Sequence, residues 1–106
     1  MGLLVQKFGG TSVGSLEKIQ KVARRVAASR AAGNDLIVVV SAIGGETDRL
    51  LSLGQKAAVE PSQREMDVLV STGEQVSAAL LAICLEDMGT PARSMMGHQA
   101  RIMTEG

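Results

Sequence analysis

Residues 7–13, Lys-Phe-Gly-Gly-Thr-Ser-Val, combine groups that suit phosphate binding. Lys7 supplies a cation, and the two residues after the glycines supply hydroxyl groups. Gly9 and Gly10 let the backbone approach a ligand closely, so that successive N–H groups can point at an anion. The segment is not a Walker A loop, because its lysine precedes the glycines. It predicts a phosphate site, and the alternative is a glycine-rich turn beside an exposed lysine.

Residues 41–48, Ser-Ala-Ile-Gly-Gly-Glu-Thr-Asp, form a second small-residue loop between an apolar run and a helical pattern. In open α/β sheets, ligands bind outside the carboxyl ends of the strands. Two such loops after neighbouring strands are therefore expected to face one crevice. The alternative is a local role, in which Thr47 caps a helix while Glu46 and Asp48 complement its dipole.

Residues 71–74, Ser-Thr-Gly-Glu, form the third segment of interest. Glu74 is predicted at the start of a helix. A carboxylate there can bind an ammonium group, or it can simply complement the helix dipole. The segment alone does not decide between these two roles.

The first loop is expected to join a strand to a helix. Residues 3–8 are a short, largely apolar run that meets the glycines, which indicates a buried strand ending in a tight loop. Ser15 is a candidate helix cap, and apolar residues then recur at helical spacing as far as Val26. Gly33 stands where a left-handed helix terminus is expected.

The second loop is expected to follow a second strand. Residues 36–40 are continuously apolar and mostly β-branched, which indicates a strand buried on both faces, as in a parallel sheet. Further on, the pattern predicts helices over residues 46–58, 63–70 and 74–88, a break at residues 71–73, and a third strand over residues 92–96. Alternation of strands and helices predicts an α/β fold with a parallel sheet.

Three segments in register, residues 7–13, residues 38–42 with 45–48, and residues 70–75, resemble the beginning of aspartate kinases. They occur in the order and at the spacing of that family, which makes the resemblance highly specific. It covers the whole chain, but only the first part of the family's kinase domain. The resemblance implies a partial amino acid kinase-like sandwich, with a mostly parallel sheet and helices on both faces.

The resemblance also implies a reaction, the transfer of the γ-phosphoryl group of ATP, with Mg²⁺, to the side-chain carboxylate of L-aspartate. The product is 4-phospho-L-aspartate, which leads to lysine, threonine and methionine. Because that carboxylate is already ionised, no general base is required. By matching positions, Lys7 is the implied catalytic residue. The positions implied to bind ATP phosphates are Lys7, Phe8, Gly9, Gly10 and Ser41. Those implied to bind aspartate are Gly45, Glu46, Thr47, Asp48, Arg49 and Glu74, the last at the α-ammonium group.

Composition argues against several other classes of function. The formal net charge is zero and 1% of the residues are aromatic, so neither a nucleic acid nor a membrane surface is expected as a partner. No apolar stretch reaches the ~18 residues of a membrane span, and no signal peptide is recognised, so the chain is expected to be cytoplasmic. Cys84 is the only cysteine, which fits a reducing compartment. His98, the only histidine, is expected at the surface, and no cluster has zinc-ligand spacing.

The chain, residues 1–106, is expected to be one truncated segment of an amino acid kinase domain, with no second domain. The family's later substrate loop and ATP lobe are not found in it, so the chain alone is expected to be inactive. Full-length members of the family are expected to form homo-oligomers. Two alternatives stay open. One is another amino acid kinase, acting on glutamate, acetylglutamate, carbamate or UMP. The other is a non-catalytic module, derived from the kinase, that binds phosphate or nucleotide or serves in assembly.

Overall fold

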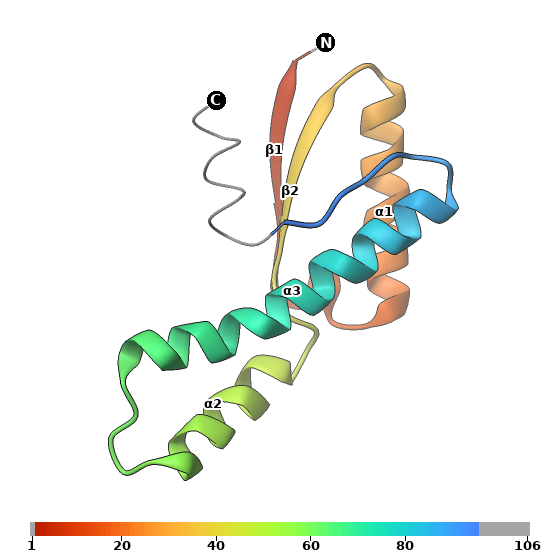
Figure 1. Cartoon of the computed structure of the whole chain (residues 1–106). Coiled ribbons are helices and arrows are strands. Elements are labelled where there is room, and N and C mark those ends of the chain that lie inside the picture. The colour runs from red at the N-terminus through yellow and green to blue at the C-terminus, as the bar shows by residue number, and fades with distance from the viewer. Residues whose placement is uncertain (1, 96–106) are drawn as a thin grey trace.

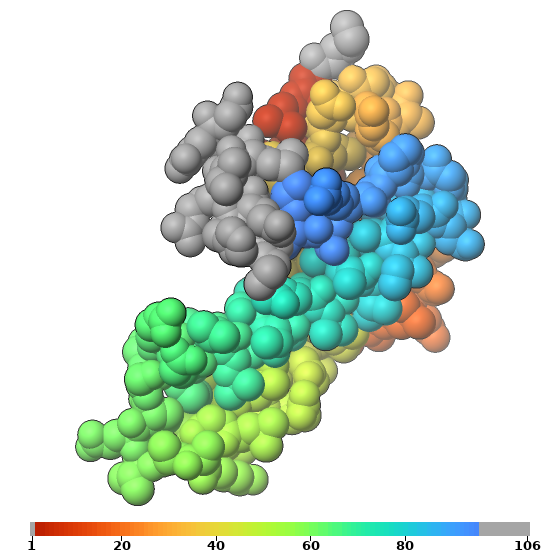
Figure 2. Space-filling model, in the orientation of Figure 1, coloured from red at the N-terminus to blue at the C-terminus, as the bar shows by residue number. Residues whose placement is uncertain are grey.

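The computed structural model describes residues 2–95, and Figure 1 shows their arrangement. In chain order the elements are β1 (Leu3–Phe8), the 3-10 helix η1 (Gly10–Val13), α1 (Leu16–Ala31), β2 (Asp35–Val40), α2 (Glu46–Ala57) and α3 (Gln63–Asp87). The alternation confirms the predicted α/β class. The molecule measures 50 × 32 × 18 Å, and α2 with the first half of α3 projects away from the sheet (Figure 1), as the corresponding part of the space-filling view also shows (Figure 2).

The two strands pair in parallel, in a register that runs from Leu3 opposite Asp35 to Phe8 opposite Val40. Helix α1 provides the crossover between them. Parallel pairing puts both carboxyl ends at the same edge of the sheet. The backbone N–H of Ser41 continues the ladder there by donating to the carbonyl of Phe8 at 3.0 Å. The loops that follow the strands therefore begin side by side.

Helix α1 begins and ends at the residues that its sequence predicts. The Oγ of Ser15 accepts a hydrogen bond from the backbone N–H of Lys18 at 3.3 Å, which caps the helix. A cap of this kind contributes about 1 kcal/mol. Gly33 follows the helix with a φ of 101°, in the left-handed region that favours glycine. The buried residues of the helix are Ile19, Val22, Ala23 and Val26.

The core lies between α1, α3 and one face of the sheet. Phe8 and Val40 pack there with aliphatic residues of both helices, including Leu81 and Leu85 of α3. The other face of the sheet differs from the expectation that residues 36–40 are buried on both sides. Val39 is 44% exposed, because no helix of residues 2–95 packs on that face.

Helix α3 corrects the prediction of two helices separated by a break at residues 71–73, because it continues through them. The hydroxyls of Ser71 and Thr72 donate to carbonyls three residues earlier, both at 2.7 Å, so they do not compete with the helix. Gly73 is buried where α3 crosses the second loop. A Cβ on it would lie 3.0 Å from the Cβ of Ala42. The glycine permits close packing and does not end the helix.

The third predicted strand is not present in the described residues. Residues 92–95 have no strand conformation, and Met96 lies outside the described range. A strand requires a hydrogen-bonded neighbour. Residues 91–95 make no backbone hydrogen bond to β2 within the described part of the chain, although they run beside it.

Helix α3 is also long and apolar enough to cross a membrane by length and composition alone, with a mean hydropathy of 1.7 over an 18-residue window. This differs from the expectation from the sequence that no apolar stretch reaches the length of a membrane span. Leu81 and Leu85 of this helix belong to the core, and Gly73 packs against the second loop. Within the structure, 22% of that window is buried.

Candidate functional site

The two glycine loops contact each other at the carboxyl edge of the sheet. A Cβ built on Gly9 would lie 3.0 Å from the Oγ of Ser41, so glycine is what allows this hydroxyl to approach the first loop. A Cβ built on Gly44 would lie 3.3 Å from the carbonyl oxygen of Gly14. Each loop therefore carries a glycine at the point where it meets the other.

A groove of about 440 Å³ lies between these loops. It is lined by Gly10, Thr11, Gly14, Lys18, Ser41, Ala42, Ile43, Gly44, Gly45 and Thr47. The prediction that the two loops face one crevice is therefore confirmed. No Asp or Glu occurs among the described lining residues, whereas hydroxyls, glycine backbone and one lysine do. Such a lining suits an anion.

The first loop is folded into η1, a single turn with exposed hydroxyls. Gly10 has a φ of 54°, which favours glycine, and the N–H of Ser12 donates to the carbonyl of Gly9 at 3.1 Å. Thr11 and Ser12 are both exposed. Their hydroxyl groups are therefore accessible to a ligand, as the sequence predicts.

Phe8 and Lys7, at the end of β1, point to opposite faces of the sheet because side chains alternate along a strand. Phe8 is buried in the core, with the guanidinium of Arg25 5.2 Å from its ring centroid. Only its backbone can therefore serve a ligand. Lys7 pairs with Val39, is exposed, and does not line the groove. Its role as the catalytic cation stays a prediction.

The second loop turns into α2 without a side-chain cap. Gly45 occupies the cap position with a φ of 82°, and no side chain accepts a hydrogen bond there. The alternative that Thr47 caps the helix is therefore wrong, and Thr47 lines the groove instead. Glu46 and Asp48 do lie in the first turn of α2, where they complement its dipole.

Glu46 and Arg49 form a two-point ion pair on the first turn of α2. The Nη2 of Arg49 lies 2.6 Å from Oε1 of Glu46, and its Nε donates to Oε2 at 3.1 Å. The hydrogen bond and the positive charge of Arg49 hold the pKa of the Glu46 carboxyl below its ordinary value. The charges of Glu46 and Arg49 are therefore paired with each other on the helix that begins beside the groove.

Glu74 is exposed and sits within α3, not at a helix start. The alternative that Glu74 only complements a helix dipole is therefore wrong, because no helix begins at this residue. The preceding residue, Gly73, packs so closely on α2 that its Cβ would lie 3.3 Å from the Cγ of Glu46. This contact brings the Glu74 turn of α3 against the start of α2. Glu74 itself is not among the residues that line the groove.

Lys18 was not singled out by the sequence, although it lines the groove. The only signal for it is its place in the first turn of α1, three residues after the cap. Within residues 2–95, no group of three or more His, Cys, Asp or Glu side chains is placed to hold a metal ion.

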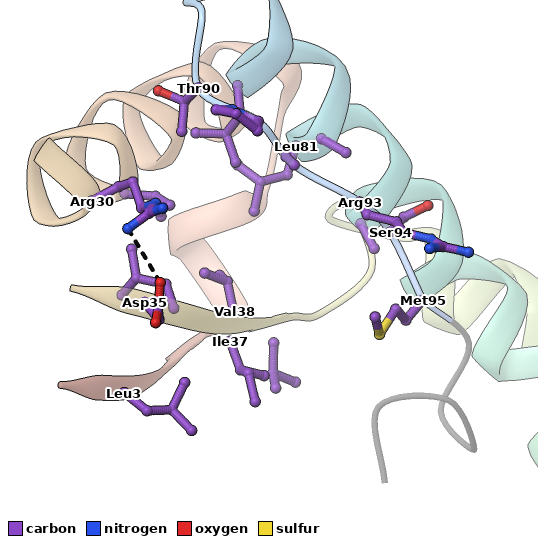
Figure 3. A pocket seen from close by; sticks show the side chains of 18 residues that line it. Leu3, Arg30, Asp35, Ile37, Val38, Leu81, Thr90, Arg93, Ser94 and Met95 are labelled. Atoms are coloured by element: carbon purple, nitrogen blue, oxygen red, sulfur yellow. Dashed lines mark ion pairs between the residues drawn. The ribbon is translucent and has the colours of Figure 1, made fainter. Parts of the chain in front are cut away.

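A second hollow, of about 550 Å³, lies between β2, the end of α3 and residues 90–95 (Figure 3). Its lining is mainly aliphatic, and Figure 3 shows Val38 and Leu81 beside it. Arg30 and Asp35 form an ion pair at one end, with 3.2 Å between Nη1 and Oδ1. Its other polar lining residues in the described part of the chain are Thr90, Arg93 and Ser94, and no glycine loop borders it, so the glycine-loop groove is the better candidate for chemistry.

The parallel sheet and the groove at its carboxyl edge, whose lining suits an anion, are features of an α/β domain with an anion-binding site. The chain belongs to the amino acid kinase family, whose profile matches residues 2–105. It is 58% identical over 105 residues to an aspartokinase of Geobacillus stearothermophilus, covering 99% of this chain and 26% of that protein. It is 55% identical over 105 residues to an aspartate kinase of Pseudomonas putida, with the same coverage.

Comparison with solved structures also indicates similarity to an aspartate kinase. The crystal structure of aspartate kinase from Synechocystis matches with a TM-score of 0.85 and 55% identity, covering 92% of this chain and 17% of that one. The resemblance to aspartate kinases is therefore confirmed. The chain spans about a quarter of the length of the curated relatives it matches, 26% in each case above.

Proposed function

We propose that this chain forms the first part of one aspartate kinase catalytic domain, which transfers the γ-phosphoryl group of Mg-ATP to the side-chain carboxylate of L-aspartate. The observation that carries the proposal is the groove between the two glycine loops, at the carboxyl edge of a parallel sheet and without an acidic side chain among its described lining residues. The 55–58% identity to aspartate kinases supports this choice over other amino acid acceptors.

The first loop and Ser41 supply the proposed phosphate subsite. Backbone N–H groups of Gly9 and Gly10 donate to phosphate oxygens, and the hydroxyl of Ser41, held against Gly9, donates beside them. Lys7 approaches the transferring group from the end of β1. Phosphoryl transfer depends mainly on positioning and on neutralising the developing charge, which fixed N–H groups and cations provide.

The second loop and Glu74 supply the proposed aspartate subsite. Thr47 in the groove and residues 45–49 around it hold the acceptor, and the Glu74 carboxylate pairs with its α-ammonium group. The attacking carboxylate oxygen forms the new P–O bond while the bond to the β-phosphate oxygen breaks. ADP leaves with that electron pair, and the acceptor becomes an acyl phosphate.

These residues are expected to need the rest of a kinase domain for turnover. Holding two reactants in line supplies much of the rate enhancement of such a reaction, and the chain carries about a quarter of the length of its relatives. Mg²⁺ enters with the nucleotide. We further propose the cytoplasm as the location and a homo-oligomer for the full-length protein.

A chimera tests the proposal directly. This chain replaces the matching segment of the Geobacillus stearothermophilus aspartokinase, and aspartate-dependent ADP release is measured together with trapping of the acyl phosphate by hydroxylamine. The proposal expects turnover with L-aspartate that is lost in Glu74→Ala, with the affinity for ATP retained. A folded chimera that binds nucleotide but forms no hydroxamate would support a non-catalytic module. Turnover with glutamate or acetylglutamate alone would indicate a different acceptor.

A further inference from the structure

We propose that Lys18 contacts the phosphoryl group being transferred and is a second cation of the phosphate subsite. This inference rests on the proposed function and adds a residue to it. Lys18 lies outside the three segments that resemble aspartate kinases, and the structure alone points to it.

The geometry places the Lys18 ammonium at the groove. Lys18 is a lining residue together with Gly10, Thr11 and Ser41. Its Cδ and Nζ both lie 3.9 Å from the position that a Cβ on Gly14 would take. The side chain therefore folds back over Gly14, the residue that packs on the second loop, while Lys18 as a whole remains exposed.

The backbone of Lys18 is fixed while its side chain is free to bind. Its N–H donates to the Oγ of Ser15 at 3.3 Å, which anchors the first turn of α1. Its ammonium makes no ion pair with any carboxylate among residues 2–95, where the three salt bridges use arginines only. A lysine with no carboxylate partner, beside a groove without acidic lining in the described residues, is available to an anion.

The position favours the phosphoryl group over the carboxylate of the acceptor. Lys18 reaches the groove from the helix that follows the first loop, and that loop supplies the proposed phosphate donors. Lys7 does not line the groove, because its side chain lies on the face of the sheet opposite Phe8. Of the two lysines at this edge, Lys18 is the one with a place inside the groove.

The test uses steady-state kinetics of the chimera with Lys18→Ala and Lys18→Arg. Lys21→Ala is the matched control, because Lys21 is an exposed lysine on the same helix that does not line the groove. One lost charge-assisted hydrogen bond is expected to lower kcat/KM for Mg-ATP about tenfold or more. The KM for aspartate is expected to stay unchanged in Lys18→Ala. Lys18→Arg is expected to recover part of the lost kcat/KM for Mg-ATP. Lys21→Ala is expected to have the same kinetic constants as the unsubstituted chimera. The loss is also expected to shrink at high ionic strength, since salt screens exposed charges.

Three results would overturn the role of Lys18 alone, while the unsubstituted chimera remains active. They are unchanged kinetics in Lys18→Ala, a rise confined to the KM for aspartate, and an equal loss in Lys21→Ala. An unsubstituted chimera that folds but forms no acyl phosphate would instead overturn the proposed function and this role with it. The two failures are therefore distinguishable.

Discussion

The contact between Gly9 and Ser41 makes a sharp prediction about how the two loops fit together. In Gly9→Ala the new Cβ lies 3.0 Å from the Oγ of Ser41, closer than ordinary van der Waals contact, and 3.9 Å from the Cβ of Ser41. The backbone of Gly9 is extended, with a φ of −135°, so alanine is not strained there. The crowding therefore arises from one hydroxyl oxygen.

The expected loss of stability in Gly9→Ala depends on the cost of moving the Ser41 hydroxyl away from the new methyl group. Moving the Ser41 side chain away from its preferred rotamer costs about 1 kcal/mol. In a Ser41→Ala background the nearest remaining contact is at 3.9 Å, which is ordinary packing. Gly9→Ala is then expected to be neutral or to stabilise by about 0.5 kcal/mol, because alanine restricts the unfolded chain. The double-mutant cycle should yield a coupling of about 1 kcal/mol.

The measurement is urea unfolding of the four proteins of the cycle, followed by far-ultraviolet circular dichroism. Gly2→Ala provides the control, because nothing lies within 4 Å of a Cβ at Gly2. The same cycle between Gly2 and Ser41 should give no coupling. Equal destabilisation by Gly9→Ala in the two Ser41 backgrounds would refute the inferred contact, and with it the fit of the loops around the groove.

Two further predictions concern the helices beside the groove. Gly73→Ala is expected to destabilise the chain by about 1 kcal/mol. Overpacking against Ala42 and Leu50 should outweigh the gain of about 1 kcal/mol in helix propensity. A higher midpoint of thermal unfolding in the variant would contradict this prediction. Arg49→Ala is expected to raise the pKa of the Glu46 carboxyl toward its ordinary value of 4.5, measured by NMR titration. Since the folded pKa lies below the unfolded one, the stability from this pair is present above about pH 4.5 and is lost as the pH falls below it. An unchanged Glu46 titration in the variant would show that the pair does not form in solution.

Local signals in the sequence were sufficient for the strands and loops that build the groove. The cap at Ser15, the left-handed Gly33 and the two apolar runs each act within a few residues, so their effects can be read without the fold. The crevice between the loops followed from one topological rule, because parallel strands end at the same edge of a sheet.

The features that were predicted wrongly or not at all depend on contacts between residues far apart in the sequence. Gly73 was interpreted as a helix break because its neighbour across the packing interface, Ala42, is not evident from the sequence. The third strand was predicted from the local pattern of residues 92–96 alone, whereas a strand needs a paired neighbour. Lys18 was missed because the path of its side chain depends on Gly14 lying beneath it.

The register of β1 gives Lys7 and Lys18 complementary places around the proposed phosphoryl group. Lys7 is one residue before the end of the strand, and its side chain lies on the face opposite the core. Lys18 lines the groove from α1, the helix that packs on the core side of the sheet. Under the proposed function, the two ammonium groups approach the transferring phosphoryl from opposite sides of the sheet. Charge in this transition state spreads over three equatorial oxygens, so two cations on different sides can each bind a different oxygen without competing.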